Sequence, residues 1–141
     1  MKKRVMCFGT FDLLHPGHLF FLQKARAQGD ELFVIIARDA RRAKISGSAP
    51  VHSEKERQIM IEALKPVTKA ILGDKKDMLV PLKKYKPAVV VLGHDQTVGV
   101  APLMAWAAAQ KNPPKIIQLT AYKRSKYSSS GIKKILCQEK K

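Results

Sequence analysis

Continuous apolar runs alternate with amphipathic runs along the chain, and this alternation is the feature that most restricts its fold. The apolar runs are short and bounded by polar residues or glycine, which is typical of buried strands. They predict strands at Val5–Phe8, Leu32–Ala37, Ala70–Leu72, Ala88–Leu92 and Ile116–Leu119. The amphipathic runs predict helices at Gly17–Gln28, after Ser53, at Asp77–Tyr85, at Pro102–Gln110 and at Ser128–Cys137. Strands that are apolar throughout and separated by helices form a parallel sheet covered on both faces.

The expected fold class is therefore α/β, a Rossmann-like doubly wound sheet of five parallel strands in a single domain over residues 1–141. Local signals support the element ends. Ser53-Glu54-Lys55-Glu56 is a capping box, and Gly29 is a helix stop. Pro81 is expected to weaken its helix, and residues 38–52 are expected to form a polar, basic loop.

Composition and charge indicate which classes of partner the chain can bind. The 141 residues are 45% hydrophobic, which suits one domain with a buried core. The formal net charge of +16 favours anionic partners, but the basic residues are spread along the chain and aromatics are only 6%. Handling of phosphates is therefore favoured over nucleic-acid binding, and a basic surface that only keeps the chain soluble remains open.

We expect a cytoplasmic protein without a membrane anchor, because no run is long enough to cross a bilayer and the first apolar run breaks at Gly9. The two cysteines, Cys7 and Cys137, match no zinc or redox spacing. Cys7 lies in a strand pattern, where a small buried side chain is expected. A disulfide between the two is not expected in a reducing compartment.

Polar clusters follow the predicted strands. They lie at residues 9–18, 38–44 and 93–96, and residues 123–130 follow the last strand. Ligands of doubly wound sheets bind outside the carboxyl ends of the strands. The clusters therefore predict one site at that edge of the sheet.

The first cluster contains His15-Pro16-Gly17-His18 at the expected start of a helix. Residues three apart on a helical turn project the same way, so both imidazoles can face one ligand. The helix N-terminus adds backbone N–H donors, and Gly17 lets a phosphate approach closely. Such a cradle suits the charge that builds up during phosphoryl transfer. Two alternatives stay open, namely half of a metal site and a structural loop with two incidental histidines.

The ten residues Gly9-Thr10-Phe11-Asp12-Leu13-Leu14-His15-Pro16-Gly17-His18 resemble the signature of the HxGH nucleotidyltransferases, the cytidylyltransferase-like superfamily. Further blocks of the chain fall in the order of that superfamily: Ala37-Arg38-Asp39, Lys44, Glu56-Arg57, Gly93-His94-Asp95-Gln96 and Ser128-Ser129-Ser130. The resemblance covers nearly the whole chain. Within the superfamily, the chain resembles two branches most, the archaeal-type FAD synthases and the glycerol-3-phosphate cytidylyltransferases. The FAD synthases are closer, because the cytidylyltransferases usually carry Trp where this chain has Gln96.

The resemblance implies a set of site residues. His15, His18 and Lys44 would be catalytic, and Asp39, Lys44 and Arg57 would bind the acceptor or phosphates. The implied nucleotide-binding residues are Thr10, Phe11, His15, Pro16, Gly17, His18, Asp95, Tyr122, Arg124, Ser128, Ser129 and Ser130. No protein-held metal is implied, and a divalent cation, Mg²⁺, would arrive with the nucleotide. Capping of a turn by Asp95, an N-cap by the serines and solvated surface roles for Lys44 and Arg57 are the alternatives.

The implied reaction joins AMP from ATP to FMN, which gives FAD and pyrophosphate without a covalent enzyme intermediate. CTP-dependent transfer to glycerol 3-phosphate or another small phosphorylated alcohol or sugar is the second possibility, and a basic nucleic-acid-binding module is the third. Homodimers are common in similar enzymes. Two departures leave base specificity open: Lys44 lacks the second lysine of a Lys-x-Lys pair, and residues 122–127 lack a Gly-Ile-Ser element, so either Lys123 or Arg124 would meet the triphosphate.

Overall fold

The structure is a computed structural model that describes residues 2–94, 96 and 99–119. Within these residues, parallel strands pair in the order β3-β2-β1-β4-β5. Their bounds are Arg4–Gly9 for β1, Glu31–Ile36 for β2, Lys69–Leu72 for β3, Val89–Leu92 for β4 and Lys115–Gln118 for β5. In the register, Met6 of β1 lies opposite Phe33 of β2 and Val90 of β4. The predicted parallel α/β sheet is confirmed.

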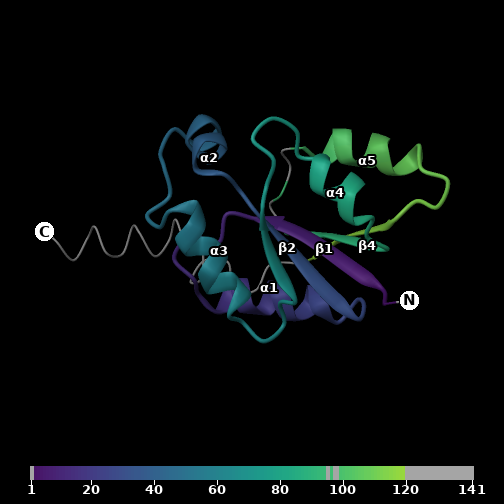
Figure 1. Cartoon of the computed structure of the whole chain (residues 1–141), viewed down its shortest axis with the longest axis horizontal. Coiled ribbons are helices and arrows are strands. Elements are labelled where there is room, and N and C mark those ends of the chain that lie inside the picture. Colours follow the sequence, from purple (N-terminus) through teal and green to yellow (C-terminus); the bar gives the residue numbers. More distant parts are fainter. Residues whose placement is uncertain (1, 95, 97–98, 120–141) are drawn as a thin grey trace, which may run out of the picture.

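Helices cover both faces of this sheet (Figure 1). They are α1 (Pro16–Arg26), α2 (Asp39–Ser46), α3 (Glu54–Glu62), α4 (Val80–Tyr85) and α5 (Val100–Ala108). One buried core joins Leu22 of α1 and Ile61 of α3 to one set of strand residues. The other core joins Leu82 of α4 and Leu103 of α5 to the alternate set. Successive strand side chains point to opposite faces, so the apolar run within each strand contributes to both cores.

Cys7 lies on β1 and is fully buried among apolar side chains. Burial raises the pKa of its thiol, because the charged thiolate is poorly solvated there. The prediction of a small buried hydrophobe at this position is confirmed. Cys137 lies outside the described residues.

Two segments differ from the sequence-based expectation. Residues 39–46 form α2 inside the stretch predicted to be a loop. Their sequence, DARRAKIS, has good helix formers but no apolar stripe, so hydrophobic periodicity does not detect the helix. The helix ends at Gly47, whose φ of 81° is the left-handed conformation that favours glycine. The second difference is Pro81, which lies in the first turn of α4, where its missing N–H is no loss, rather than weakening the helix interior.

The order of the strands creates the site. The chain leaves β1 for β2 and β3 on one side, then returns to add β4 and β5 on the other side. The connections after β1 and β4 therefore diverge at adjacent strand ends, which is where doubly wound sheets bind ligands. In Figure 1, α2 lies beyond these strand ends, while α1 and α3 lie below the sheet. None of the described helices is long and apolar enough to span a membrane. The predicted helix Ser128–Cys137 lies outside the described residues.

Candidate active site

The loop after β1 is tightly folded around one aromatic ring. A Cβ on Gly9 would lie 2.5 Å from the ring of Phe11, so only glycine lets that ring fold back over the strand end. Phe11 is buried, and both Phe11 and Leu13 adopt a positive φ, at 55° and 51°. Non-glycine residues rarely adopt this conformation, and it is concentrated at functional sites. The loop is thus held in one shape ahead of the histidines.

His15 and His18 cap helix α1 with their own side chains. His15 is the N-cap, and its Nδ1 accepts a hydrogen bond of 3.1 Å from the N–H of Gly17. The Nδ1 of His18 accepts one of 3.3 Å from the N–H of His15. Because each Nδ1 is an acceptor, each neutral imidazole carries its hydrogen on Nε2. This reciprocal pair is a capping box built from histidines.

The two imidazoles are stacked, with centroids 3.8 Å apart and an interplanar angle of 27°. Desolvation lowers the pKa of both. For His18 the pKa falls to about 4, mainly through burial and also through His15, while the carboxylate of Asp12 opposes the shift. The pair is therefore uncharged at neutral pH and presents Nε2–H donors rather than positive charges.

The hydrogen-bond donors available for a phosphate at the start of α1 differ from those expected. The sequence suggested that backbone N–H groups at the helix start would hold a phosphate. In the structure the Gly17 N–H is taken by His15, and Pro16 has none to offer. The donors at this point are the imidazole Nε2–H groups, and the dipole of α1 supplies the favourable field for an anion.

We expect the pKa of His18 to be about 4, and the protein to lose stability as the pH falls from 6.5 toward that value. The unfolded chain, with an ordinary histidine, binds the proton more readily than the folded one in this window. The free energy of unfolding should fall by roughly 1.4 kcal/mol per pH unit there, about 3 kcal/mol in all. Histidine NMR titration and urea unfolding at several pH values measure both. His18→Gln keeps the helix cap and should reduce this slope, to which His15 also contributes through its lowered pKa; an unchanged slope would contradict the pKa given to His18.

Asp12 fixes the segment before α3. It is 4% exposed, and its carboxylate accepts from the N–H groups of Val51 and His52 at 2.8 and 3.0 Å. The loop after β1 is thereby joined to the entry of α3. The ten-residue signature contained Asp12, but its role was not predicted, because no local sequence pattern indicates which distant backbone a carboxylate will accept from.

Arg57 was expected to bind the acceptor or a phosphate, but its side chain is buried. Its side chain is 0% exposed and donates to the carbonyls of Thr10 (2.7 Å), Ala37 (2.8 Å) and His52 (3.1 Å). It also forms an ion pair of 2.6 Å with Asp39. Direct binding of a phosphate by Arg57 is at odds with this burial, because its donors already face inward. Arg57 is instead a positioning residue that joins the ends of β1 and β2 to α3.

Asp39 connects this network to α2. Besides its ion pair with Arg57, it accepts from the N–H of Glu54 at 3.1 Å, and Glu54 accepts from the N–H of Asp39 at 3.0 Å. The first turns of α2 and α3 thus cap each other. Arg38 completes the cluster with an ion pair to Glu54 of 2.6 Å. The hydrogen bonds that the Glu54 carboxylate accepts from the N–H of Asp39 and from Arg38 hold its pKa below the usual range.

Three of the remaining predicted residues lie within the described part of the chain. Lys44 is exposed in the last turn of α2, and its catalytic role stays a prediction. Thr10 and Phe11 lie beside the histidines at the end of β1, where the Phe11 ring meets His18 edge-on at 5.6 Å. The other predicted site residues lie outside the described residues: Asp95, Tyr122, Lys123, Arg124, Ser128, Ser129 and Ser130.

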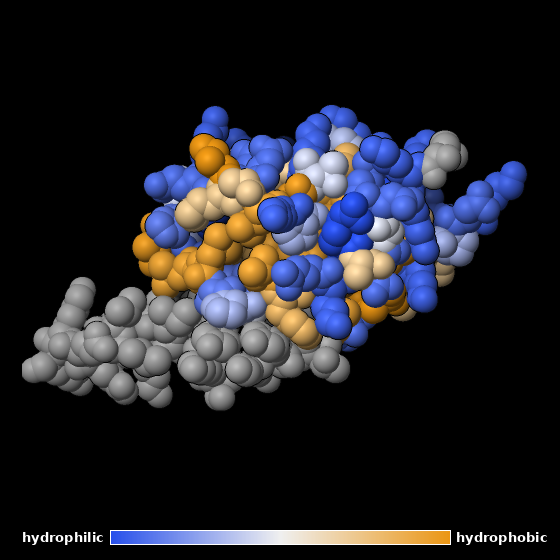
Figure 2. All heavy atoms as spheres, turned by 90° about the horizontal axis from the view of Figure 1, so that it is seen from below, coloured by the Kyte–Doolittle hydropathy of each residue, from blue (hydrophilic) through white to orange (hydrophobic). Residues whose placement is uncertain are grey.

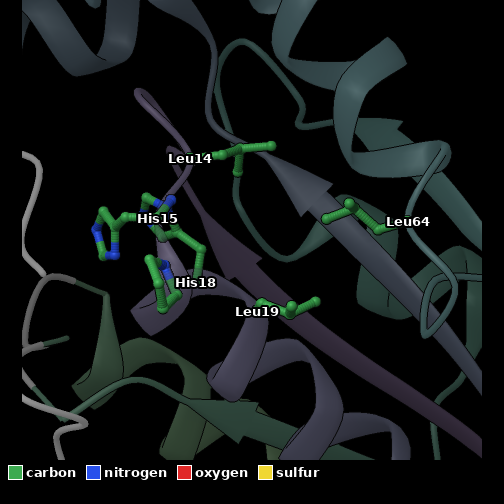
Figure 3. A pocket seen from close by; sticks show the side chains of 6 residues that line it. Leu14, His15, His18, Leu19 and Leu64 are labelled. Carbon is green, nitrogen blue, oxygen red and sulfur yellow. The ribbon is translucent and has the colours of Figure 1, made fainter.

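An apolar hollow of about 250 Å³ adjoins the histidine pair (Figure 3). Leu14, Pro16 and Leu19 line it from the loop and the start of α1, and Leu64 lines it from beyond the end of α3. Figure 3 shows the leucines around the opening and both imidazoles at one side. Sequence patterning did not locate this hollow. Among the described residues, no group of three or more His, Cys, Asp or Glu side chains could hold a metal ion.

The doubly wound sheet and the two stacked imidazoles at the start of its first helix are the features on which the resemblance to nucleotidyltransferases rests. Comparison with protein families agrees: residues 6–135 match the family described as Cytidylyltransferase-like. The chain belongs to this family and is a nucleotidyltransferase. The resemblance derived from the His15–His18 motif is confirmed at the level of the family.

The chain is similar to curated proteins from methanogens named FAD synthase. The protein from Methanosarcina mazei is 44% identical over 135 residues, covering 94% of this chain and 88% of the relative. The one from Methanosarcina barkeri is 43% identical over 135 residues, covering 94% and 96%. The one from Methanosarcina acetivorans is 44% identical over 128 residues, covering 91% and 83%.

Solved structures share the fold. The crystal structure of a protein described as a lipopolysaccharide core biosynthesis protein, from Thermoplasma volcanium GSS1, is 37% identical with a TM-score of 0.79. The match covers 86% of this chain and 99% of that protein. A pantoate-beta-alanine ligase from Francisella tularensis is 15% identical with a TM-score of 0.59 over 94% of this chain and 68% of its own, which supports the fold alone.

Proposed function

We propose that the protein is an FMN adenylyltransferase, which converts ATP and FMN into FAD and pyrophosphate. The observation that carries this function is the identity of 43–44% to FAD synthases over 94% of the chain. The paired imidazoles lie at the carboxyl end of β1, where the reaction needs donors for phosphate oxygens. These relatives support both FMN as the acceptor and ATP as the nucleotide, and the fold is consistent with this pair of substrates.

In the reaction, an oxygen of the FMN phosphate attacks the α-phosphorus of ATP. A new phosphorus–oxygen bond forms, the bond between the α-phosphorus and the bridging oxygen breaks, and pyrophosphate leaves with that oxygen. The Nε2–H groups of His15 and His18 donate to oxygens on the reacting phosphates as negative charge shifts toward the leaving group. Neutral donors at a desolvated helix start are already oriented, so little reorganisation accompanies the step.

Other contacts complete the site. Lys44 would hold a phosphate of either substrate from α2, and the N–H groups of Thr10 and Phe11 would meet the nucleotide. From outside the described residues, we keep Asp95 for the nucleoside and Tyr122, Arg124 and the serines 128–130 for the triphosphate. Mg²⁺ bound to the phosphates would neutralise charge on the leaving pyrophosphate. We further propose a cytoplasmic enzyme that does not act on nucleic acid, with a homodimer as a possible assembly.

Pyrophosphate release in the presence of Mg²⁺ tests the substrates, with ATP and CTP each combined with FMN and with glycerol 3-phosphate. We expect release with ATP and FMN only, with FAD identified by chromatography. Release restricted to CTP and glycerol 3-phosphate would contradict the proposed acceptor and base, and would instead support the cytidylyltransferase alternative. As a control, the protein is treated with nuclease before the assay. Pyrophosphate release that persists after this treatment does not come from bound nucleic acid.

A further inference from the structure

Large apolar side chains that line the hollow beside the histidine pair are partly exposed. Leu14 and Leu19 are 36% and 39% exposed, although each directly adjoins the imidazoles in the sequence and in the fold. Leu64 and Pro16 complete a lining that contains no Lys, Arg, Asp or Glu among the described residues. Figure 2 shows apolar surface gathered on this side of the molecule, where α1 and α3 lie.

The apolar surface is continuous with the phosphate donors. His15, His18 and Leu19 lie within one turn of helix α1, and residues three and four apart share a face of a helix. One ligand can therefore touch the imidazoles with a phosphate and the leucines with an apolar group. FMN has this combination: a phosphate that must reach the imidazoles and, at the other end of a flexible ribityl chain, a planar tricyclic ring with a hydrophobic dimethylbenzene edge.

We propose that the hollow binds the isoalloxazine ring of FMN, with the dimethylbenzene edge packed against Leu14, Leu19 and Leu64. This inference rests on the proposed function and assigns the acceptor half of its site. The adenine of ATP is a poorer occupant, because a purine is recognised through hydrogen bonds to its ring nitrogens and amino group. The described lining offers only the imidazoles as polar side chains, and in the proposed reaction these donate to phosphate oxygens.

Leu14→Gln and Leu19→Gln test the assignment with little risk to folding, because both side chains are partly exposed already. Burial of one leucine side chain against a ligand corresponds to roughly a tenfold change in affinity or more. We expect each variant to raise the KM for FMN about tenfold, with the KM for ATP within about twofold of the parent. Met104→Gln is the matched control, since Met104 is a large apolar residue, 51% exposed, on α5 across the sheet. It should leave both KM values unchanged.

A binding measurement separates this inference from the proposed function. The affinity for FMN can be measured from the quenching of its fluorescence, with and without a non-hydrolysable ATP analogue. We expect this affinity to be about tenfold weaker in the two leucine variants. A rise in the KM for ATP alone would assign the hollow to the nucleotide and overturn the proposal, and unchanged FMN affinity would also overturn it. Failure of the parent protein to form FAD from ATP and FMN would instead overturn the proposed function.

Discussion

Replacement of His18 by alanine should lower kcat about 100- to 1,000-fold, while the affinity for ATP changes only a few-fold. The Nε2–H of His18 is a donor held in place by the hydrogen bond from the His15 N–H to its Nδ1. Its contribution grows as charge builds up on the phosphates, so its loss affects the transition state more than the bound substrate. Single-turnover FAD formation and equilibrium binding of an ATP analogue measure the two quantities separately.

The same change also removes a helix cap, which by itself costs roughly 1 kcal/mol of stability. His18→Gln separates the two effects, because glutamine at this position of a capping box can accept from the same N–H. We expect His18→Gln to keep most of the stability yet lose the rate. Gln23→Ala, an exposed position on the same helix, is the control and should behave like the parent. Full turnover by His18→Gln would contradict the role given to the imidazole.

Arg57→Met should destabilise the fold by about 3–5 kcal/mol. The change leaves the carbonyls of Thr10, Ala37 and His52 without their buried donor and takes the ion-pair partner from Asp39. Total stabilities of single domains are typically about 5–15 kcal/mol, so the variant should unfold at a much lower urea concentration. Arg57→Lys retains the charge but has fewer donors, and its stability should lie between those of the parent and Arg57→Met.

Lys55→Met on the same helix is the matched control for this series. Lys55 is exposed, so its replacement should change stability by less than about 0.5 kcal/mol. If Arg57 bound a substrate phosphate from a solvated position, Arg57→Met would behave like this control in stability and lose only substrate affinity. That result would contradict the positioning role. A large loss of stability, partly restored in Arg57→Lys, is the result expected from its burial.

Much of the architecture could be predicted because one physical pattern repeats. A strand buried on both faces must be apolar throughout, so residues such as Val34 and Val90 reveal strands without any knowledge of their neighbours. The capping box at Ser53 was predicted and is present, with the Glu56 N–H bonded to the serine side chain at 3.2 Å. Helix α2 was missed because it packs no apolar stripe and is fixed by Asp39 and Glu54, whose pairing depends on tertiary structure.

The candidate site was predictable in its location and less so in its contacts. The spacing of His15 and His18 around Pro16-Gly17 indicates a shared face at a helix start, and the structure stacks the two rings there. Sequence spacing could not indicate that His15 would occupy the Gly17 N–H, nor that Arg57 would be turned inward. Both outcomes depend on which backbone groups from distant segments need a partner, and local sequence does not record that.

Transfer of label from ATP to flavin tests the central claim most directly. Purified protein is incubated with Mg²⁺, FMN and ATP labelled at the α-phosphate, and in parallel with ATP labelled at the γ-phosphate. We predict that the α-label appears in FAD and the γ-label in pyrophosphate, with neither label becoming covalently attached to the protein. FAD that stays unlabelled in the first reaction, or label that accumulates on the protein before FAD forms, would contradict direct adenylyl transfer at the His15–His18 site.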